Sequence, residues 1–119
     1  EVRISNAFSQ KQLTQTLQEL KNIKGPKALI SRGECRLLTR RRFHAKGLTL
    51  PLFQINQEKS TKCGVRIDDF ACPAIVKATV KPKGEPVYSI NPDLCLGCAV
   101  CMQICPEGAI HSAKREEKK

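Results

Sequence analysis

The sequence predicts an α+β fold in which a domain built from two similar halves follows a short β-α-β unit. Three observations lead to this prediction: four cysteines lie close together between residues 95 and 105, the segment from residue 50 onward repeats itself, and the N-terminal segment alternates between strand and helix patterns. Aromatic residues make up only 4% of the 119 residues. Because so few large side chains are available, we expect a bound metal group to supply cross-links that the core lacks.

The N-terminal segment shows the pattern of a strand, a helix and a second strand. Val2 and Ile4 alternate with polar residues, and residues 28–30 are apolar. Between them, Ser9 lies three residues before Gln12, which is the spacing of a helix-capping box. The helix that follows carries an apolar stripe at helical spacing, formed by Leu13, Leu17, Leu20 and Ile23. Gly25-Pro26 is expected to end it.

Two parallel strands and one helix cannot bury both faces of their sheet. We therefore expect this unit to form the edge of a larger α/β sheet, supplied by further chain or by a partner, with residues 28–30 as a short buried strand. Packing of the unit against the cysteine-containing domain is the alternative.

The four C-terminal cysteines and the following proline have the spacing C-x2-C-x2-C-x3-C-P. This spacing is that of bacterial-type ferredoxins, in which short loops turn the thiolates toward a [4Fe–4S] cluster. The alternatives are zinc and disulfides. Zinc ribbons favour two separated C-x2-C pairs, and disulfide frameworks favour an even cysteine count with a secretory signal. Seven cysteines without such a signal indicate instead a reducing cytoplasm.

The two halves of this domain can be aligned residue by residue. Residues 53–56 correspond to residues 88–91, and residues 74–75 correspond to residues 109–110. The cysteines align in part: Cys63 corresponds to Cys98 and Cys72-Pro73 to Cys105-Pro106, whereas Ser60 and Arg66 stand where Cys95 and Cys101 stand in the second half. The pattern predicts a ferredoxin-like domain of the bacterial two-cluster type, with a pseudo-twofold βαβ repeat and one half degenerate.

In such domains the fourth cysteine of each motif ligates the cluster of the other half. The predicted ligands of one complete [4Fe–4S] cluster are therefore Cys72, Cys95, Cys98 and Cys101. Only Cys63 and Cys105 remain for the second site, so we expect one cluster and one empty, collapsed remnant.

The surrounding sequence predicts how the strands pair. Residues 50–56 and 109–113 are expected to pair as terminal strands, and residues 75–80 and 86–90 to form a hairpin across Lys83-Gly84. Residues 114–119 contain no apolar side chain and are expected to form a disordered tail.

The net charge of +10 suggests an anionic partner. The basic run Arg40-Arg41-Arg42 with Lys46 is expected to dock an acidic ferredoxin or to contact the rest of a larger enzyme; plain solvated charge is the alternative. Nucleic acid is disfavoured because aromatic stacking residues are nearly absent. No apolar segment is long enough to cross a membrane. Cys35, the seventh cysteine, is expected to be a small buried apolar residue, or else a third ligand for the degenerate site.

The chain resembles the C-terminal part of the large subunit in the indolepyruvate ferredoxin oxidoreductase family. This family belongs to the thiamine-diphosphate-dependent 2-oxoacid:ferredoxin oxidoreductases. The resemblance covers about residues 1 to 112 and rests on residues 25–30, on Cys35, and on the paired cysteine motifs, including the five residues that separate Arg66 from Cys72.

The resemblance implies that residues 1–46 are the β-α-β tail of an α/β thiamine-diphosphate-type domain and that residues 50–113 are the ferredoxin-like domain. It implies electron transfer within an enzyme that oxidatively decarboxylates a 2-oxoacid. The chain lacks the Gly-Asp-Gly stretch that would bind thiamine diphosphate, so decarboxylation would need the remaining part or subunit. The alternatives are a stand-alone single-cluster electron carrier and a basic iron–sulfur protein that binds nucleic acid.

Overall fold

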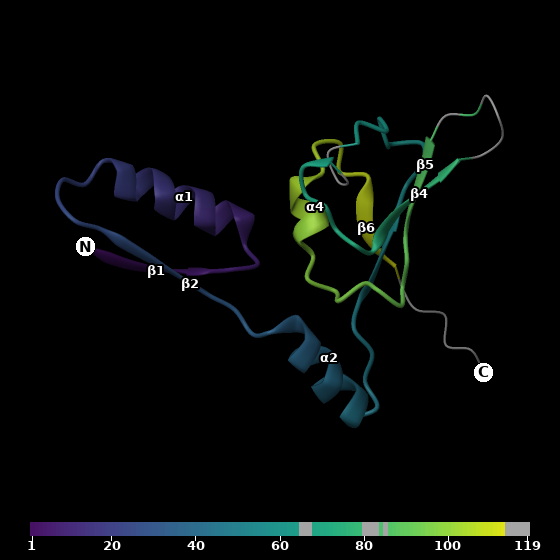
Figure 1. Ribbon diagram of the computed structural model, residues 1–119, viewed down its shortest axis with the longest axis horizontal. Helices are drawn as coiled ribbons and strands as arrows, with labels where there is room; N and C mark the ends of the chain where they lie inside the picture. Colours follow the sequence, from purple (N-terminus) through teal and green to yellow (C-terminus); the bar gives the residue numbers. More distant parts are fainter. Residues whose placement is uncertain (65–67, 80–83, 85, 114–119) are drawn as a thin grey trace. The chain divides into compact units, whose positions relative to one another are not determined.

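The computed structural model describes residues 1–64, 68–79, 84 and 86–113. The chain separates into two compact units, Glu1–Cys35 and Arg36–Lys119 (Figure 1). The predicted domain boundary lay after residue 46, so the segment 36–46 falls with the second unit in this division.

The first unit is a β-α-β unit, as the sequence predicts. It consists of β1 (Val2–Asn6), α1 (Gln10–Lys21) and β2 (Ala28–Arg32). The two strands pair in parallel, with Val2 opposite Ala28 and Asn6 opposite Arg32. The connection between them is therefore the crossover helix that a parallel pair requires.

Side chains fix both ends of α1. At the N-terminus, the Ser9 hydroxyl accepts a hydrogen bond from the Gln12 amide at 3.3 Å, and the Gln12 side-chain oxygen accepts one from the Asn6 amide at 3.2 Å. The predicted capping interaction of Ser9 is thus confirmed. At the C-terminus, the Lys27 ammonium group donates to the carbonyls of Leu20 and Ile23 at 2.8 and 2.7 Å. The Leu20 carbonyl also accepts a hydrogen bond from the Ile23 amide at 3.2 Å, so Lys27 adds a second donor at the end of the helix.

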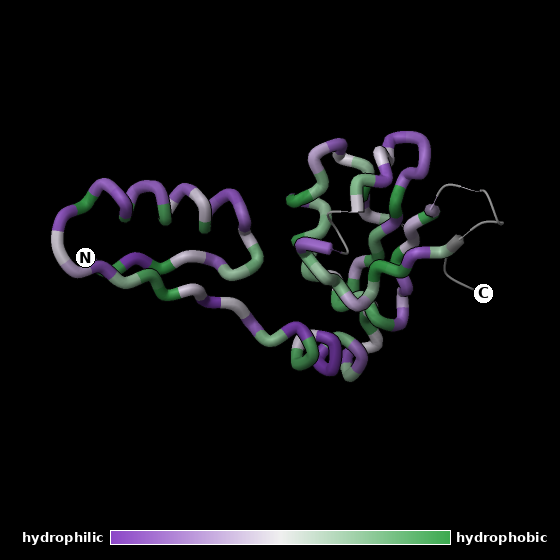
Figure 2. Tube along the Cα trace, turned by 45° about the horizontal axis from the view of Figure 1, so that its top comes forward, coloured by the Kyte–Doolittle hydropathy of each residue, from purple (hydrophilic) through white to green (hydrophobic). Residues whose placement is uncertain are grey.

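One face of the β1–β2 sheet is apolar and exposed. Helix α1 contacts β1, and Ser5 on that strand is only 1% exposed. The alternate residues Val2, Ile4 and Ile30 lie on the opposite face and are 63%, 57% and 47% exposed. The alternation of hydrophobic and hydrophilic residues along these strands can be followed in Figure 2. The predicted burial of residues 28–30 is therefore wrong, because one helix covers only one face.

In its described residues, the second unit has helices α2 and α4 and two small antiparallel sheets. Its elements are α2 (Arg36–Ala45), β3 (Leu52–Ile55), β4 (Ile75–Thr79), β5 (Pro86–Ile90), α4 (Val100–Ile104) and β6 (Ile110–Ala113). Strand β3 pairs with β6 and β4 pairs with β5, which confirms the predicted pairings within two residues at each end. The predicted strand end at Val80, the turn residue Lys83 and the predicted tail 114–119 lie outside the described residues.

The core of the second unit is small and contains two of the cysteines. The buried cluster consists of Phe53, Ile75, Cys101, Cys105, Ala109 and Ile110. Its members come from β3, β4, α4 and β6 and from the short segments beside them. Within the described residues, no helix has the length and hydrophobicity needed to span a bilayer.

Candidate metal centre

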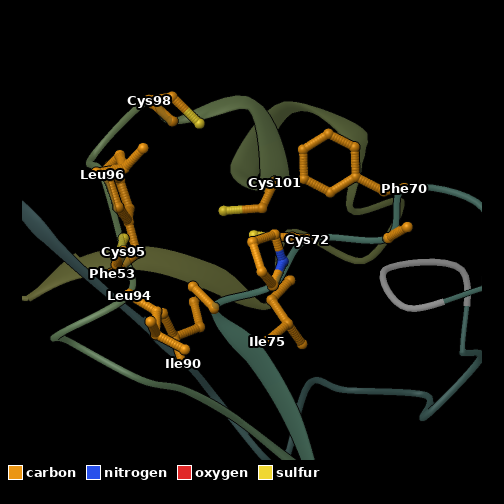
Figure 3. Close-up of a pocket in the computed structure, with 14 residues that line it drawn as sticks. Phe53, Phe70, Cys72, Ile75, Ile90, Leu94, Cys95, Leu96, Cys98 and Cys101 are labelled. Atoms are coloured by element: carbon orange, nitrogen blue, oxygen red, sulfur yellow. The ribbon is translucent and has the colours of Figure 1, made fainter. Parts of the chain in front are cut away.

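Four cysteines from both halves of the second unit line one pocket (Figure 3). They are Cys72 from the first half and Cys95, Cys98 and Cys101 from the second half. The pocket has a volume of about 240 Å³. In Figure 3 the four side chains surround a common space rather than stacking on one side of it. The structure therefore brings together the four residues that sequence reasoning selected as ligands of one cluster.

The rest of the pocket lining is apolar. Besides the cysteines it consists of Phe53, Phe70, Ala71, Pro73, Ala74, Ile75, Ile90, Leu94, Leu96 and Ala99. Such a lining limits water access to a bound group and strengthens local electrostatic interactions. Thiolates are the ligands that iron–sulfur clusters prefer, so the donor set and its surroundings fit such a cluster.

The cysteine loop between β5 and α4 depends on left-handed backbone conformations. Gly97, which precedes Cys98, has a φ of 62°, and a Cβ atom there would lie 3.0 Å from the Pro51 carbonyl oxygen. Glycine is therefore required both by the conformation and by the close approach. Ala99, on the other side of Cys98, has a φ of 60° and bears the strain of a non-glycine residue in that region.

The last cysteine of the motif marks the end of α4. Cys101 lies on this helix and is 7% exposed. Cys105 follows the helix with a φ of −75° and a ψ of 112°, an extended conformation. Pro106 explains this ending, because a proline disfavours helical conformation in the residue before it. The chain then turns into β6.

The Cys101 thiol has a raised pKa in this pocket. Burial, followed by the negative charges of Cys98, Cys72 and Cys95, raises the pKa of the Cys101 thiol from 9.0 to about 11. The metal-free site therefore favours a protonated Cys101. A cationic metal group would offset the unfavourable free energy of a buried Cys101 thiolate, because metal binding is coupled to release of the thiol protons.

The remaining cysteines lie elsewhere. Cys63 is exposed, and Cys105 is buried in the core, where its sulfur accepts a hydrogen bond from the Ala109 amide at 3.4 Å. Neither lines the pocket of the four cysteines. Cys35 is exposed, so its predicted burial is wrong. In the described part of the chain, no three His, Cys, Asp or Glu side chains converge as ligands of a single metal ion would.

Sequence reasoning missed α2 and its role beside the cysteine loop. Arg36 donates hydrogen bonds to the carbonyls of Leu96 and Gly97, and Arg40 donates one to the carbonyl of Asp93. Arg40 was predicted as part of a docking surface and instead contacts the protein's own backbone. The available signal was weak: the segment 36–45 lacks glycine and proline and is rich in arginine and leucine, which favour helix.

Similarity to a known protein family identifies the class of the second unit. The family model described as "4Fe-4S binding domain" matches residues 88–111, which contain the last three residues of β5, the cysteine loop and α4. The second unit is therefore an iron–sulfur domain with a ferredoxin-like α+β fold of mixed helices and small sheets. A 4Fe–4S cluster is its cofactor.

Curated relatives narrow the class further. The chain is 33% identical over 113 residues to the indolepyruvate oxidoreductase subunit IorA of Archaeoglobus fulgidus, and 29% identical over 116 residues to that of Pyrococcus horikoshii. These matches cover 95% and 98% of this chain but only 17% of each relative. A protein named ferredoxin 7Fe, from Hydrogenibacillus schlegelii, is 35% identical over 43 residues, which are 36% of this chain and 55% of that protein.

These relatives confirm the predicted resemblance to an indolepyruvate oxidoreductase subunit. The chain spans about one sixth of the length of the IorA relatives that it matches. No solved structure matches the chain.

Proposed function

We propose that this chain is the electron-transfer part of a 2-oxoacid:ferredoxin oxidoreductase of the indolepyruvate type. The observation that carries the proposal is the convergence of four cysteines from both halves of the second unit on one apolar pocket. A 4Fe–4S cluster bound there supplies a one-electron carrier. The names of the IorA relatives support the assignment to this enzyme class.

The proposed ligands are Cys72, Cys95, Cys98 and Cys101. With all four thiolates engaged, no position remains open for a substrate, so the site suits electron relay rather than substrate chemistry. The apolar side chains that line the pocket limit the access of water to a bound cluster. The proposed location is a reducing, cytoplasmic compartment, because such a compartment keeps cysteines reduced and able to ligate a cluster.

The proposed pseudo-twofold repeat is supported by hydrogen bonds that occur in both halves. The Asn56 amide donates to the Ala109 carbonyl, and the corresponding Asn91 amide donates to the Ala74 carbonyl, both at 2.7 Å. Each asparagine side chain also accepts a hydrogen bond from the amide two residues later at 2.9 Å. The two halves thus exchange equivalent contacts.

The first half also retains the backbone shape of a cluster-binding loop. Lys62 and Gly64, which flank Cys63, have φ angles of 55° and 75°, and the corresponding Gly97 and Ala99 have φ angles of 62° and 60°. Ser60 takes the place of a ligating cysteine and is 8% exposed. We propose that this second site has lost its cluster by ligand replacement while keeping its loop.

The first unit is proposed to be the edge of an α/β domain of thiamine-diphosphate type. Its uncovered apolar face, with Val2, Ile4 and Ile30, supports this, because a parallel sheet is stable only with both faces covered. The IorA relatives are about six times longer than their match to this chain, so such enzymes contain ample polypeptide to cover the face. The proposed partner is thus the remaining thiamine-diphosphate part or subunit.

A stand-alone single-cluster carrier is the second candidate, favoured by the match to a protein named ferredoxin. The exposed face of the β1–β2 sheet argues against it, since a free carrier would expose that apolar face to water. Co-purification separates the two candidates. If a thiamine-diphosphate polypeptide elutes with the chain at constant ratio, the oxidoreductase assignment stands; a monomeric chain that exchanges electrons alone supports the carrier.

The electron partner is proposed to be an acidic ferredoxin that docks on the basic side of α2. Arg41, Arg42 and Lys46 are exposed there. Exchanging all three for glutamine is expected to slow electron delivery to an acidic ferredoxin several-fold at low salt, with the difference shrinking as salt rises, because steering by exposed charges is screened. Stopped-flow absorbance measures the rate, and the cluster spectrum should be unchanged.

The matched control replaces three exposed lysines of the first unit, Lys11, Lys21 and Lys24, with glutamine. It removes the same charge without touching α2. Equal slowing in both variants would mean that overall charge, not docking on α2, sets the rate. Salt-dependent binding of DNA or RNA with unaltered ferredoxin reduction would favour the nucleic-acid alternative.

A further inference from the structure

Two arginines one turn apart on α2 hold the backbone of the cysteine loop. The Arg36 guanidinium donates to the Leu96 carbonyl through Nε and Nη2, at 3.2 and 3.1 Å, and to the Gly97 carbonyl through Nη2 at 2.8 Å. The Arg40 guanidinium donates through Nη1 to the Asp93 carbonyl at 2.9 Å. Both arginines are partly buried.

These three carbonyls belong to the loop that presents the first two cysteines of the motif. The Leu96 and Gly97 carbonyls lie between Cys95 and Cys98 in the chain. In a trans peptide the N–H points opposite to the C=O of the same peptide plane. Because Arg36 holds the carbonyls on one side, the amides of Gly97 and Cys98 point to the other side.

We propose that Arg36, supported by Arg40, is a positioning residue that fixes the orientation of the cysteine loop and raises the reduction potential of the cluster. The proposal rests on the cluster ligands assigned above. A guanidinium is the suitable group, because its rigid fork of donors reaches two adjacent carbonyls at once and its charge is permanent.

Two effects act in the same direction. A fixed positive charge beside the loop stabilises the more negative, reduced state of a bound cluster. Loop amides that stay oriented away from Arg36 remain available to the thiolates, and hydrogen bonds to cluster sulfurs also raise the potential. Removing Arg36 is therefore expected to make the midpoint potential more negative and to loosen the loop.

The experiment compares Arg36→Gln, Arg36→Lys and the control Arg41→Gln in the full chain. Arg41 is exposed on the same helix, so its replacement removes one charge nearby without touching the loop carbonyls. Three quantities are measured: the midpoint potential by EPR-monitored titration, the rate of cluster loss to an iron chelator, and amide hydrogen exchange in the metal-free chain. The exchange reporter is the Cys95 amide, which donates to the Asn91 carbonyl at 3.0 Å.

Arg36→Gln is expected to lower the potential, to speed cluster loss on the order of 10-fold, and to speed exchange of the Cys95 amide. Arg41→Gln is expected to change none of these by a comparable amount. Arg36→Lys keeps the charge but lacks the fork, so it should recover part of the potential while the loop amide still exchanges faster. Arg40→Gln should show the same changes with smaller magnitude. It replaces Arg36→Gln as the test variant if Arg36→Gln does not fold.

The proposal is overturned if Arg36→Gln and Arg41→Gln shift the potential equally, or if Arg36→Lys matches the unaltered chain in every readout, since charge alone would then suffice. A wrong assignment of the cluster ligands would give a different experimental result. In that case the unaltered chain would bind no cluster at all, whereas the hydrogen-exchange comparison would still report on the loop.

Discussion

Cys72→Ser is expected to remove the cluster almost completely, whereas Cys63→Ser leaves it in place. Cys72 comes from the first half and lines the same pocket as the three cysteines of the second half, whereas Cys63 of the first half does not line it (Figure 3). A serine hydroxyl is a poorer ligand for iron than a thiolate, so one corner of the site would lose its bond. We expect loss of bound iron on the order of 10-fold or more at limiting iron.

Cys63→Ser is a matched control, because it makes the same chemical change at an exposed cysteine outside the pocket. The measurement is the absorbance of the anaerobically reconstituted protein near the thiolate-to-iron charge-transfer band, with iron content per chain. Equal losses in the two variants would contradict the assignment of Cys72 as the ligand supplied across the two halves.

The double substitution Ser60→Cys with Arg66→Cys is expected to create a second cluster. It restores the cysteine pattern of the second half in the first half, with Cys63 already present and Cys105 as the cross-ligand. The loop around Cys63 has left-handed residues at the same positions as the loop around Cys98. Ser60 already accepts a hydrogen bond from the Lys62 amide at 3.4 Å, an arrangement in which a cysteine sulfur can replace the hydroxyl.

Iron and sulfide should rise from about four to about eight of each per chain in this variant. A second EPR signal, coupled to the first, should appear on reduction. The control is Ser60→Ala with Arg66→Ala, which removes the same two side chains without adding ligands and should stay at about four. A cysteine variant that also stays at about four would show that the first half has lost more than its ligands.

The cysteine spacing and the repeat were enough to predict which four cysteines line one pocket and how the strands pair. Ligand spacing is a local property, and the pairing of β3 with β6 follows from aligning the two halves. The presence of Cys72 in the same pocket as the three cysteines of the second half was predictable for the same reason. These features depend on residues that the sequence displays directly.

The contacts of α2 were not predictable in this way. Arg36 and Leu96 lie 60 residues apart, and nothing in a basic run distinguishes an arginine that holds a loop from one that faces solvent. The position of each arginine on the helix determines whether it reaches the loop. Arg36 and Arg40 share one face of α2, whereas Arg41 lies on another. Likewise, the apolar pattern of residues 28–30 indicated a strand but not whether its second face is covered. Covering of the second face depends on polypeptide outside this chain.

Anaerobic analysis of iron and acid-labile sulfide in the unaltered chain, with EPR of the reduced protein, tests the central claim most directly. One cluster held by Cys72, Cys95, Cys98 and Cys101 predicts about four iron and about four sulfide per chain, with a single one-electron signal. About eight of each with two interacting signals, or zinc without sulfide, would contradict the account.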